Sequence, residues 1–572
     1  MSAAAEPLEE VIPATPTPIP ATPVAIEAMP DINDIPFRDN QAIYQYDDPG
    51  SVVVIYVTVR MGNAAENTNY TWAEVNSFNK WLDGSRSADL VVGAAEAIVQ
   101  FGDETGPLPG QLGYDAVVPN ATIHIRGASS SEEIQKSYKI ELNEDAGKWR
   151  GQSTLALNKH IYDLSRMKNK LNFDLMKQIP NLVSLRTQFV HLYVKDQTVD
   201  PWSTKFVDYG LFTQIEQVNR RFLKNHGLDP NGHLYKATSF DFDWDGELIR
   251  VETDPLYNEE EFSNELEIKG NRDHSKLIEM LDAVNDSETP IDQSFEEFFD
   301  EGNYFTWMAY TILSGNVDTQ NQNFFLYSPL NSKTWYIIPW DYDSSYFREG
   351  RLKFDHSPDQ YYERGIANYW GGRLHSRVLK VDKYRRMLDD KINELMEFLT
   401  PERFEGLLAI YKPVVEPYVF RLPDVKYLNG DRVEFDYQYA TVYEELQRNY
   451  RLYLESLEQP MPFYYDTPEI LGNKMLFRWD ESYSFEPQDI IYHFEISKDF
   501  DFKNIVYKND IVNLTSEEID TPEPGRYFWR VISENETGKF MYSIESYYDS
   551  ENHMHDGMRS FIITPDGEVI VE

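Results

Sequence analysis

The chain has 572 residues, 41% of them hydrophobic and 14% aromatic, and this length and composition predict two or more globular domains with sizeable cores. Against 53 Lys and Arg stand 96 Asp and Glu, a net charge of −43 that would repel nucleic acid and favour basic partners or bound cations. A surface that is acidic only for solubility is the alternative. The absence of cysteine excludes disulfides, thiolate nucleophiles and cysteine-ligated zinc. No apolar run approaches the roughly 18 residues of a membrane helix, so we expect no transmembrane segment.

The first 30 residues contain seven prolines and no basic residue. This composition predicts a Pro-rich, disordered tether over residues 1–35, rather than a signal peptide or a helix. We expect that an export signal, of the lipoprotein kind, has been removed and that the protein is extracellular or attached to a cell surface through this tether. A cytoplasmic protein with an unrelated N-terminal extension is the competing interpretation.

Residues 36–119 open with a β-rich run at 51–60, continue with a helix-like segment at 71–84 and end in a Gly/Pro-rich stretch. We interpret them as the N-terminal part of the domain that follows, forming a lid or a small subdomain. Two alternating strands come next, Ala121 to Arg126 and Ser137 to Leu142, on either side of a turn rich in Gly and Ser. This pattern predicts a hairpin whose tip presents backbone N–H groups and hydroxyls.

A helix is predicted at 163–178, where apolar residues recur at helical spacing, and strands are predicted at 187–195 and 208–216. From 121 to 216 the expected order is therefore strand, loop, strand, helix, strand, strand. The segment after Glu216 turns helical and is expected to end at Gly227, a residue suited to terminate a helix.

Helices are predicted again at 290–314 and between 372 and 458. The last hundred residues change character, because short alternating strands recur about every ten residues and predict a β-sandwich. Trp479 and the strand GRYFWRV resemble those of a fibronectin type III module. A spacer or an interaction module is the expected role of this part.

One stretch, GNVDTQNQNFFLYSPLNSKTWYIIPWDYD at 315–343, carries the polar residues whose spacing suggests chemistry. Asp318 is followed five residues later by Asn323, and two apolar runs around a PLNS turn lead to Asp341. Paired as strands, these runs would bring Asn323 and Asp341 to one end of a ladder, where two oxygen ligands can share a divalent cation. Protein kinases use such an order of Asp, Asn, hairpin and Asp for phosphoryl transfer.

Taken with further motifs, this stretch resembles the CotH (spore coat protein H-like) kinase family, which occurs in exported bacterial proteins and some eukaryotes. The matching pieces are RGASSS, KSYKIEL, YDLSRMKNKL, DYGLFTQIEQVNRRFL, LYK, GNVDTQNQNFFLY and WYIIPWDYD. The resemblance implies an atypical, protein-kinase-like two-lobed fold over residues 120–460. With the all-β, fibronectin type III-like sandwich expected over 461–572, the fold class is α+β. The resemblance also implies an ATP- and Mg²⁺-dependent kinase that phosphorylates Ser or Thr of a secreted or surface protein.

The resemblance further implies roles for individual residues. Asp318 would be the catalytic base or would orient the acceptor, while Asn323 and Asp341 would bind the metal. The residues implied to bind ATP are Arg126, Gly127, Ser129, Ser130, Lys139 and Glu216. An acidic enzyme is also expected to prefer a basic, Ser-rich acceptor protein, which its field would concentrate.

Some positions depart from the family pattern or leave alternatives open. Ala128 stands where the family loop usually has Asn, which removes one polar contact to the nucleotide. Lys139 has no glutamate on the helix that follows it, so Asp174 or Glu216 would have to pair with it. Asp343 is interpreted as a solvated turn residue rather than a further ligand, and Lys236 as an exposed lysine.

Three classes of function remain open from the sequence. An active CotH-type kinase is favoured. The alternative is a catalytically weak surface scaffold or adhesin-like binding protein that keeps the kinase fold, which the Ala128 substitution, the tether and the terminal sandwich would suit. A third class is another metal-dependent enzyme that uses the same acidic pair, such as a hydrolase or a nucleotidyl or glutamyl transferase.

Overall fold

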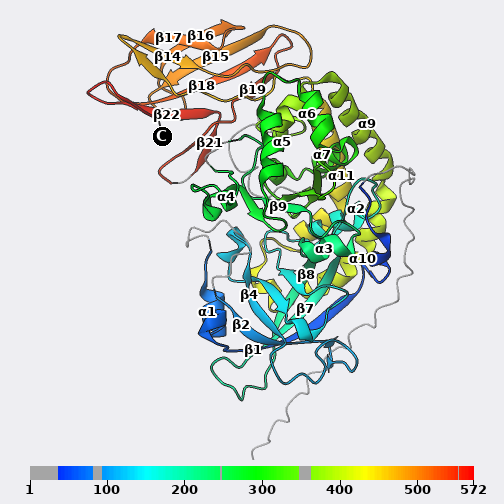
Figure 1. Ribbon diagram of the computed structural model, residues 1–572. Helices are drawn as coiled ribbons and strands as arrows, with labels where there is room; N and C mark the ends of the chain where they lie inside the picture. Colours follow the sequence, from blue (N-terminus) through cyan, green and yellow to red (C-terminus); the bar gives the residue numbers. More distant parts are fainter. Residues whose placement is uncertain (1–36, 81–92, 245–247, 347–361, 552, 572) are drawn as a thin grey trace, which may run out of the picture.

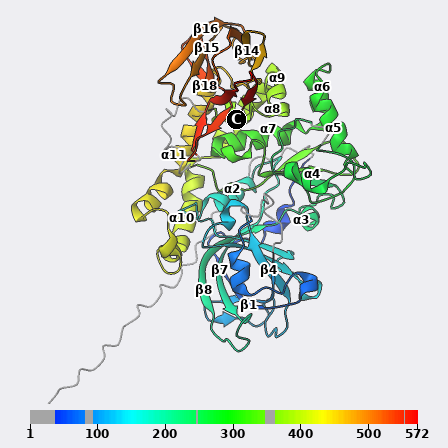
Figure 2. The same cartoon turned by 90° about the vertical axis from the view of Figure 1, so that its left-hand side faces the viewer.

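The computed structural model describes residues 37–80, 93–244, 248–346, 362–551 and 553–571, so the predicted tether at 1–35 lies outside the described residues. A sheet-rich N-terminal part, a helical middle part and a C-terminal β part follow one another along the chain (Figure 1). After a quarter turn, the N-terminal sheet and the C-terminal β part still lie at opposite ends, with the helices between them (Figure 2). Among the described residues no helix has the length and apolar character needed to span a membrane.

The N-terminal part is built on an eight-stranded sheet in the order β1-β7-β8-β6-β5-β4-β2-β3. The sheet closes on itself because β1 pairs both with β7, in parallel, and with β2, antiparallel. One face of its long strands packs into a single apolar cluster. The strands are β1 (Val52–Arg60), β2 (Ala95–Asp103), β3 (Gly106–Pro107), β4 (Ala121–Arg126), β5 (Ser137–Leu142), β6 (Thr154–Asn158), β7 (Thr187–Asp196) and β8 (Val207–Glu216).

The predicted hairpin is confirmed, because β4 and β5 have the expected bounds and pair antiparallel, with Arg126 opposite Ser137. The predicted order missed two strands. β2 lies inside the stretch interpreted as Gly/Pro-rich, and β6 lies between the hairpin and the helix. Since β2 joins β1 to β4, the segment before residue 120 completes the sheet that carries the hairpin.

The middle part contains a four-stranded sheet in the order β10-β9-β11-β12, covered by helices. Helix α7 packs against β12, α9 and α11, and its side chains are buried on nearly every face. The strands are β9 (His233–Ala237), β10 (Leu266–Ile268), β11 (Phe324–Ser328) and β12 (Tyr336–Pro339). The α-helices of the described residues are α1 (Trp72–Ser77), α2 (Lys168–Met176), α3 (Arg220–Asn225), α4 (Glu259–Glu265), α5 (Ser275–Asn285), α6 (Ile291–Phe298), α7 (Glu301–Ser314), α8 (Arg373–Leu379), α9 (Asp382–Phe398), α10 (Pro401–Val419) and α11 (Arg432–Ser456).

The C-terminal part is all β. Its core joins a three-stranded sheet, β13-β14-β17, to a larger sheet in the order β16-β15-β18-β22-β23, around Trp479 and Trp529. A sandwich is therefore present, and its fibronectin type III character stays a prediction. The strands are β13 (Glu469–Leu471), β14 (Lys474–Arg478), β15 (Ile490–Ser497), β16 (Ile505–Val512), β17 (Ser516–Asp520), β18 (Gly525–Asn535), β19 (Phe540–Tyr542), β20 (Ser546–Tyr548), β21 (Met554–Asp556), β22 (Met558–Ile563) and β23 (Val569–Val571).

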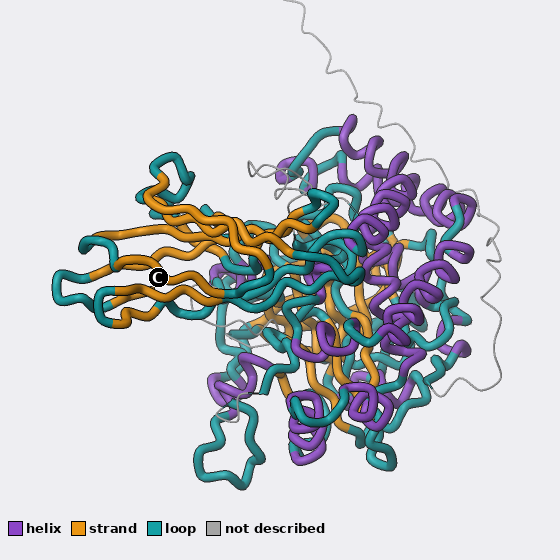
Figure 3. Tube along the Cα trace, turned by 90° about the horizontal axis from the view of Figure 1, so that it is seen from above, coloured by secondary structure: helices purple, strands orange, loops and turns teal. Residues whose placement is uncertain are grey.

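The sandwich packs against the helical part, so the two parts are joined by side-chain contacts as well as by the covalent connection between them. Trp370 stacks on Tyr483 of the sandwich at 5.2 Å between ring centroids, and Tyr464 donates a hydrogen bond to the carbonyl of Gly371. Seen from above, the sandwich projects to one side of the helices (Figure 3). The fold as a whole is α+β, with a large N-terminal sheet and a C-terminal all-β part.

Candidate functional site

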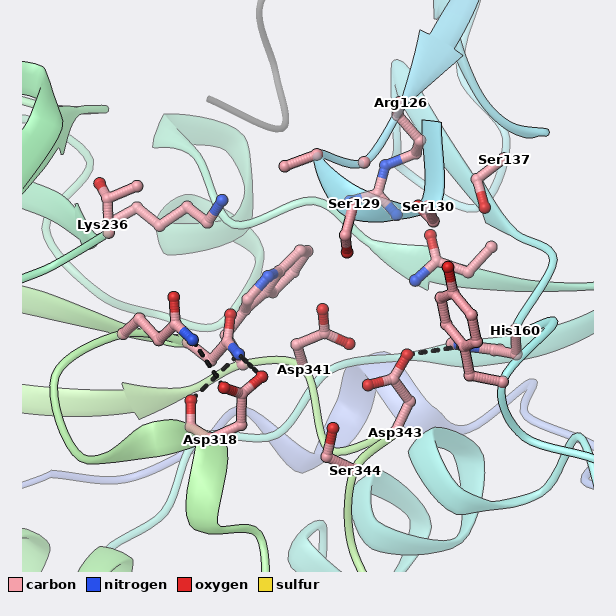
Figure 4. A pocket seen from close by; sticks show the side chains of 18 of the residues that line it. Arg126, Ser129, Ser130, Ser137, His160, Lys236, Asp318, Asp341, Asp343 and Ser344 are labelled. Carbon is pink, nitrogen blue, oxygen red and sulfur yellow. Dashed lines mark hydrogen bonds and ion pairs between the residues drawn. The ribbon is translucent and has the colours of Figure 1, made fainter. Parts of the chain in front are cut away.

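A cavity of about 700 Å³ lies between the two sheets that the first two parts of the chain contribute. From the eight-stranded sheet it takes the tip of the β4–β5 hairpin and the residues that end β6. From the four-stranded sheet it takes the end of β9, the turn before β11 and the segment after β12 (Figure 4). The predicted site residues that line it are Arg126, Gly127, Ser129, Ser130, Asp318, Asn323 and Asp341.

The hairpin predicted from the PLNS turn exists, and it has the expected consequence. Phe324 of β11 pairs with Pro339 of β12, so Asn323 and Asp341 follow at the same end of the ladder. Both have left-handed backbone conformations, with φ of 58° and 54°. Such angles are unfavourable for residues other than glycine and occur mostly at turns and functional sites.

Asp318 lies in the 3₁₀ turn that connects helix α7 to β11. Its two carboxylate oxygens accept hydrogen bonds from amides of the same turn, Gln322 Nε2 at 2.6 Å and Asn323 Nδ2 at 3.0 Å. Asn323 Nδ2 also donates to the Asp318 carbonyl at 3.1 Å. Since the amide nitrogen of Asn323 holds Asp318, the amide oxygen is the Asn323 atom that can bind a cation.

Asp341 is held by two asparagines. Asn169 Nδ2 donates to its carboxylate at 2.9 Å, and Asn316 Nδ2 donates to its carbonyl at 3.1 Å. Burial raises the pKa of Asp341 to about 6 and the neighbouring carboxylate of Asp343 adds to the rise, while the hydrogen bond from Asn169 opposes it. A buried carboxylate beside a second one is an environment that a bound cation would relieve.

Asp343 lies in a turn, as interpreted from the sequence, and its side chain is 35% exposed, but it also lines the cavity. Its carboxylate lies 3.4 Å from Nδ1 of His160, whose side chain is buried. Burial alone would raise the pKa of Asp343, but the hydrogen bond and positive charge of His160 outweigh it, so the net shift is downward. Asp343 therefore adds a negative charge beside Asp341 (Figure 4).

The tip of the β4–β5 hairpin forms one wall of the cavity. Gly127 has a φ of 89°, and a Cβ there would come within 2.1 Å of Ser130 Oγ, so the turn requires glycine. Arg126 is 5% exposed, stacks over the ring of Trp340 at 5.9 Å, and has a buried Nε without a hydrogen-bond partner among the described residues. A buried guanidinium with a donor to spare is suited to an anion.

Two predicted ATP-binding residues are not brought to the cavity. Lys139 lies on the same face of β5 as Ser137 but two residues farther along the strand, and pairs with Glu141 at 3.1 Å. Glu216 lies at the end of β8, where it pairs with Arg186 and with His226 at 3.1 Å. The cavity takes Asn158 at the opposite end of the neighbouring strand β6.

The partners suggested for Lys139 are therefore engaged elsewhere. Besides Glu216, Asp174 of α2 is held by Lys170 at 3.0 Å and by Lys177 at 2.6 Å. The opposite correction applies to Lys236, which was interpreted as exposed. Lys236 is 6% exposed, lines the cavity from β9 and lies 3.6 Å from Glu267 on the adjacent strand. In Figure 4 Lys236 and Arg126 approach the carboxylates from different sides.

Sequence reasoning missed several lining or supporting residues. Asn158 ends β6 and His160 follows it, and because this strand was not predicted, nothing placed the two residues at the cavity. Asn169 belongs to the motif YDLSRMKNKL, but only its apolar spacing was interpreted. What marks Asn169 is that it is a polar residue on a helix whose residues are all buried. Because this burial is visible only in the tertiary structure, the sequence alone could not identify Asn169.

The fold and the site define a class of protein: an α+β protein that gathers acidic and amide side chains in a cavity between two sheets. Compared with known proteins, the chain matches the CotH kinase protein family over residues 123–457. It is also 23% identical to the inner spore coat protein H of Bacillus subtilis (strain 168) over 343 residues, which cover 58% of this chain and 85% of that protein. The chain belongs to the CotH kinase family.

Proposed function

We propose that the protein is an atypical Ser/Thr protein kinase of the CotH type, with a kinase-like two-lobed fold, that uses ATP and Mg²⁺. The observation that carries the proposal is the β11–β12 hairpin, which brings Asp318, Asn323 and Asp341 to one cavity in the order of a kinase active site. The family to which the chain belongs is a family of kinases, and this agrees with the proposal.

The donor set fits magnesium. Mg²⁺ prefers hard oxygen ligands and in kinases is bound by one or two carboxylate or amide side chains together with substrate phosphates. Asp341 and Asn323 would supply a carboxylate and an amide oxygen from the same end of the hairpin. The metal would neutralise charge on the phosphates of ATP.

The cations that face the cavity fit a polyphosphate. Arg126, with its unpartnered Nε, and Lys236, from the opposite sheet, would bind phosphate oxygens. Lys236 takes this role in place of Lys139, whose ammonium group pairs with a carboxylate outside the cavity. Gly127, Ser129 and Ser130 would add backbone N–H groups and hydroxyls from the hairpin tip.

Asp318 would hold the acceptor hydroxyl and receive its proton. A bond forms between the Ser or Thr oxygen and the γ-phosphorus, the bond from that phosphorus to the β,γ-bridging oxygen breaks, and ADP leaves. The amides of Gln322 and Asn323 fix both oxygens of Asp318, which orients the carboxylate for this task.

The acceptor class and the location follow from charge and family. A chain of net charge −43 would attract a basic, Ser-rich protein. The related inner spore coat protein H is by its name a spore coat component, which supports a secreted or surface location for this chain as well.

The proposal is tested by phosphate incorporation into a basic, Ser-rich peptide, followed by mass spectrometry with wild type and Asp318→Asn. Mg²⁺-dependent transfer to Ser or Thr in wild type, reduced at least a thousandfold in Asp318→Asn, is expected. Transfer at the same rate in Asp318→Asn, or attachment of a nucleotide or an amino acid instead of phosphate, would contradict it.

A further inference from the structure

Helix α2 is buried around its whole circumference although several of its residues are polar. A polar side chain in such a place is tolerated only when its hydrogen-bonding groups find partners. The partners of Asn169, which is 1% exposed, therefore indicate what this position of the helix is for.

Both ends of the Asn169 amide bind the segment that follows β12. Nδ2 donates to Asp341 Oδ1 at 2.9 Å, and Oδ1 accepts from the backbone N–H of Tyr342 at 2.6 Å. The first bond fixes one carboxylate oxygen of Asp341, so the other oxygen, Oδ2, is the one left to a ligand. The second bond fixes the peptide that carries this side chain.

The backbone at Asp341 needs such support because its φ of 54° is in the left-handed region. Asn169 holds the peptide after Asp341, and Asn316 holds the carbonyl of Asp341 itself at 3.1 Å. Asn316 precedes Asp318 by two residues and is 1% exposed. The two asparagines thus connect Asp341 to α2 on one side and to the Asp318 turn on the other.

We propose that Asn169 is a positioning residue that directs the carboxylate of Asp341 toward a divalent metal ion in the cavity. This inference rests on the proposed function. Side chains that orient metal ligands without touching the metal typically change metal affinity by roughly 10- to 100-fold when they are removed. Asn169 has the required geometry, because it touches the proposed ligand and lies outside the cavity lining.

The experiment measures binding of a non-hydrolysable ATP analogue to the full chain at increasing Mg²⁺ concentration. In Asn169→Ala the Mg²⁺ concentration for half-maximal binding is expected to rise roughly 10- to 100-fold. The matched control is Asn303→Ala. Asn303 is also 1% exposed and forms hydrogen bonds of 2.6 Å and 3.0 Å with the backbone N–H and carbonyl of Ile337. In Asn303→Ala the Mg²⁺ concentration for half-maximal binding is expected to stay within twofold of the wild-type value.

The outcomes separate the two proposals. A wild type whose analogue binding does not depend on Mg²⁺ would overturn the proposed function and this inference with it. A Mg²⁺-dependent wild type with an unshifted Asn169→Ala would overturn the positioning role alone, as would an equal shift in Asn303→Ala. If Asn169→Ala does not fold, Asn169→Ser, which keeps one hydrogen-bonding group in a smaller side chain, carries the same test.

Discussion

Asn323 and Asp341 lie beyond the same end of the β11–β12 ladder, next to its first residue pair, Phe324 with Pro339, and both have a left-handed backbone. The chain accepts an unfavourable conformation, costing roughly 1 kcal/mol for an ordinary residue, at these two positions, which both line the cavity. In these two residues backbone conformation and side-chain chemistry can be tested separately.

Replacing Asn323 by Gly or by Ala makes that separation. Both variants lose the amide that donates to Asp318, so phosphate incorporation is expected to fall strongly in both. Alanine also has to adopt a φ of 58°, so Asn323→Ala should be less stable than Asn323→Gly by about 1 kcal/mol. Urea unfolding measures this difference, and an alanine variant as stable as the glycine variant would contradict it.

The two lysines predict different effects on nucleotide binding. Lys236 lines the cavity, whereas Lys139 pairs with Glu141 outside it. Lys236→Met is expected to weaken ATP binding at least tenfold, because a phosphate loses a buried cation, and Lys139→Met to change it less than twofold. Fluorescence titration with a labelled ATP analogue gives both constants. A reversed order would restore Lys139 as the phosphate-binding lysine.

Ala128 can be returned to the residue usual in the family. It occupies the cap position of the 3₁₀ turn Ser129–Ser131, where no side chain accepts a hydrogen bond. Ala128→Asn would supply an acceptor to a backbone N–H of that turn, so the free energy of unfolding should rise by about 1 kcal/mol. ATP should also bind a few-fold more tightly through the ordered tip. Ala128→Gln, too long to cap, serves as the control, and a similar gain in both variants would contradict the capping effect.

The buried cluster of His226, Asp39 and Glu216 predicts a pH-dependent stability. Burial lowers the pKa of His226, but the charges of Asp39 and then Glu216 outweigh it and raise the pKa to about 9. The stabilisation is complete below the ordinary pKa of about 6.5 and is lost as the pH rises through 9. The free energy of unfolding should therefore fall from pH 6.5 to pH 9.5 in wild type. The fall should be absent in His226→Gln, and equal slopes for both proteins would rule out the His226 cluster as its cause.

Elements with a strong local pattern could be predicted from the sequence. β4 and β5 alternate clearly around a turn, and the apolar runs of β11 and β12 lie on either side of the PLNS turn, so both pairings followed from the residues alone. β2 and β6 could not be recognised, because β2 lies beside Gly- and Pro-rich segments and β6 is joined to its partner β5 by a long loop rather than a tight turn. Both exist because neighbours on each side complete the closed sheet, which is a tertiary effect.

The site was predictable to the same extent. The order of Asp318, Asn323 and Asp341 could be interpreted because the hairpin that brings them together is local. The environment of each lysine could not, since burial of Lys236 depends on β9 lying between β10 and β11. Likewise Glu216 pairs with Arg186 and His226, and neither of these two residues belongs to the motifs that resemble the kinase family.

The most direct test of the account is calorimetric titration of ATP into the wild-type protein with Mg²⁺, then with EDTA, beside Asp341→Asn. The account predicts micromolar binding that requires the metal and is lost in the variant. Because burial and then Asp343 raise the pKa of Asp341 to about 6, protons should also displace the metal as the pH falls below that value. Equal ATP affinity of wild type and Asp341→Asn in the presence of Mg²⁺ would contradict the metal site.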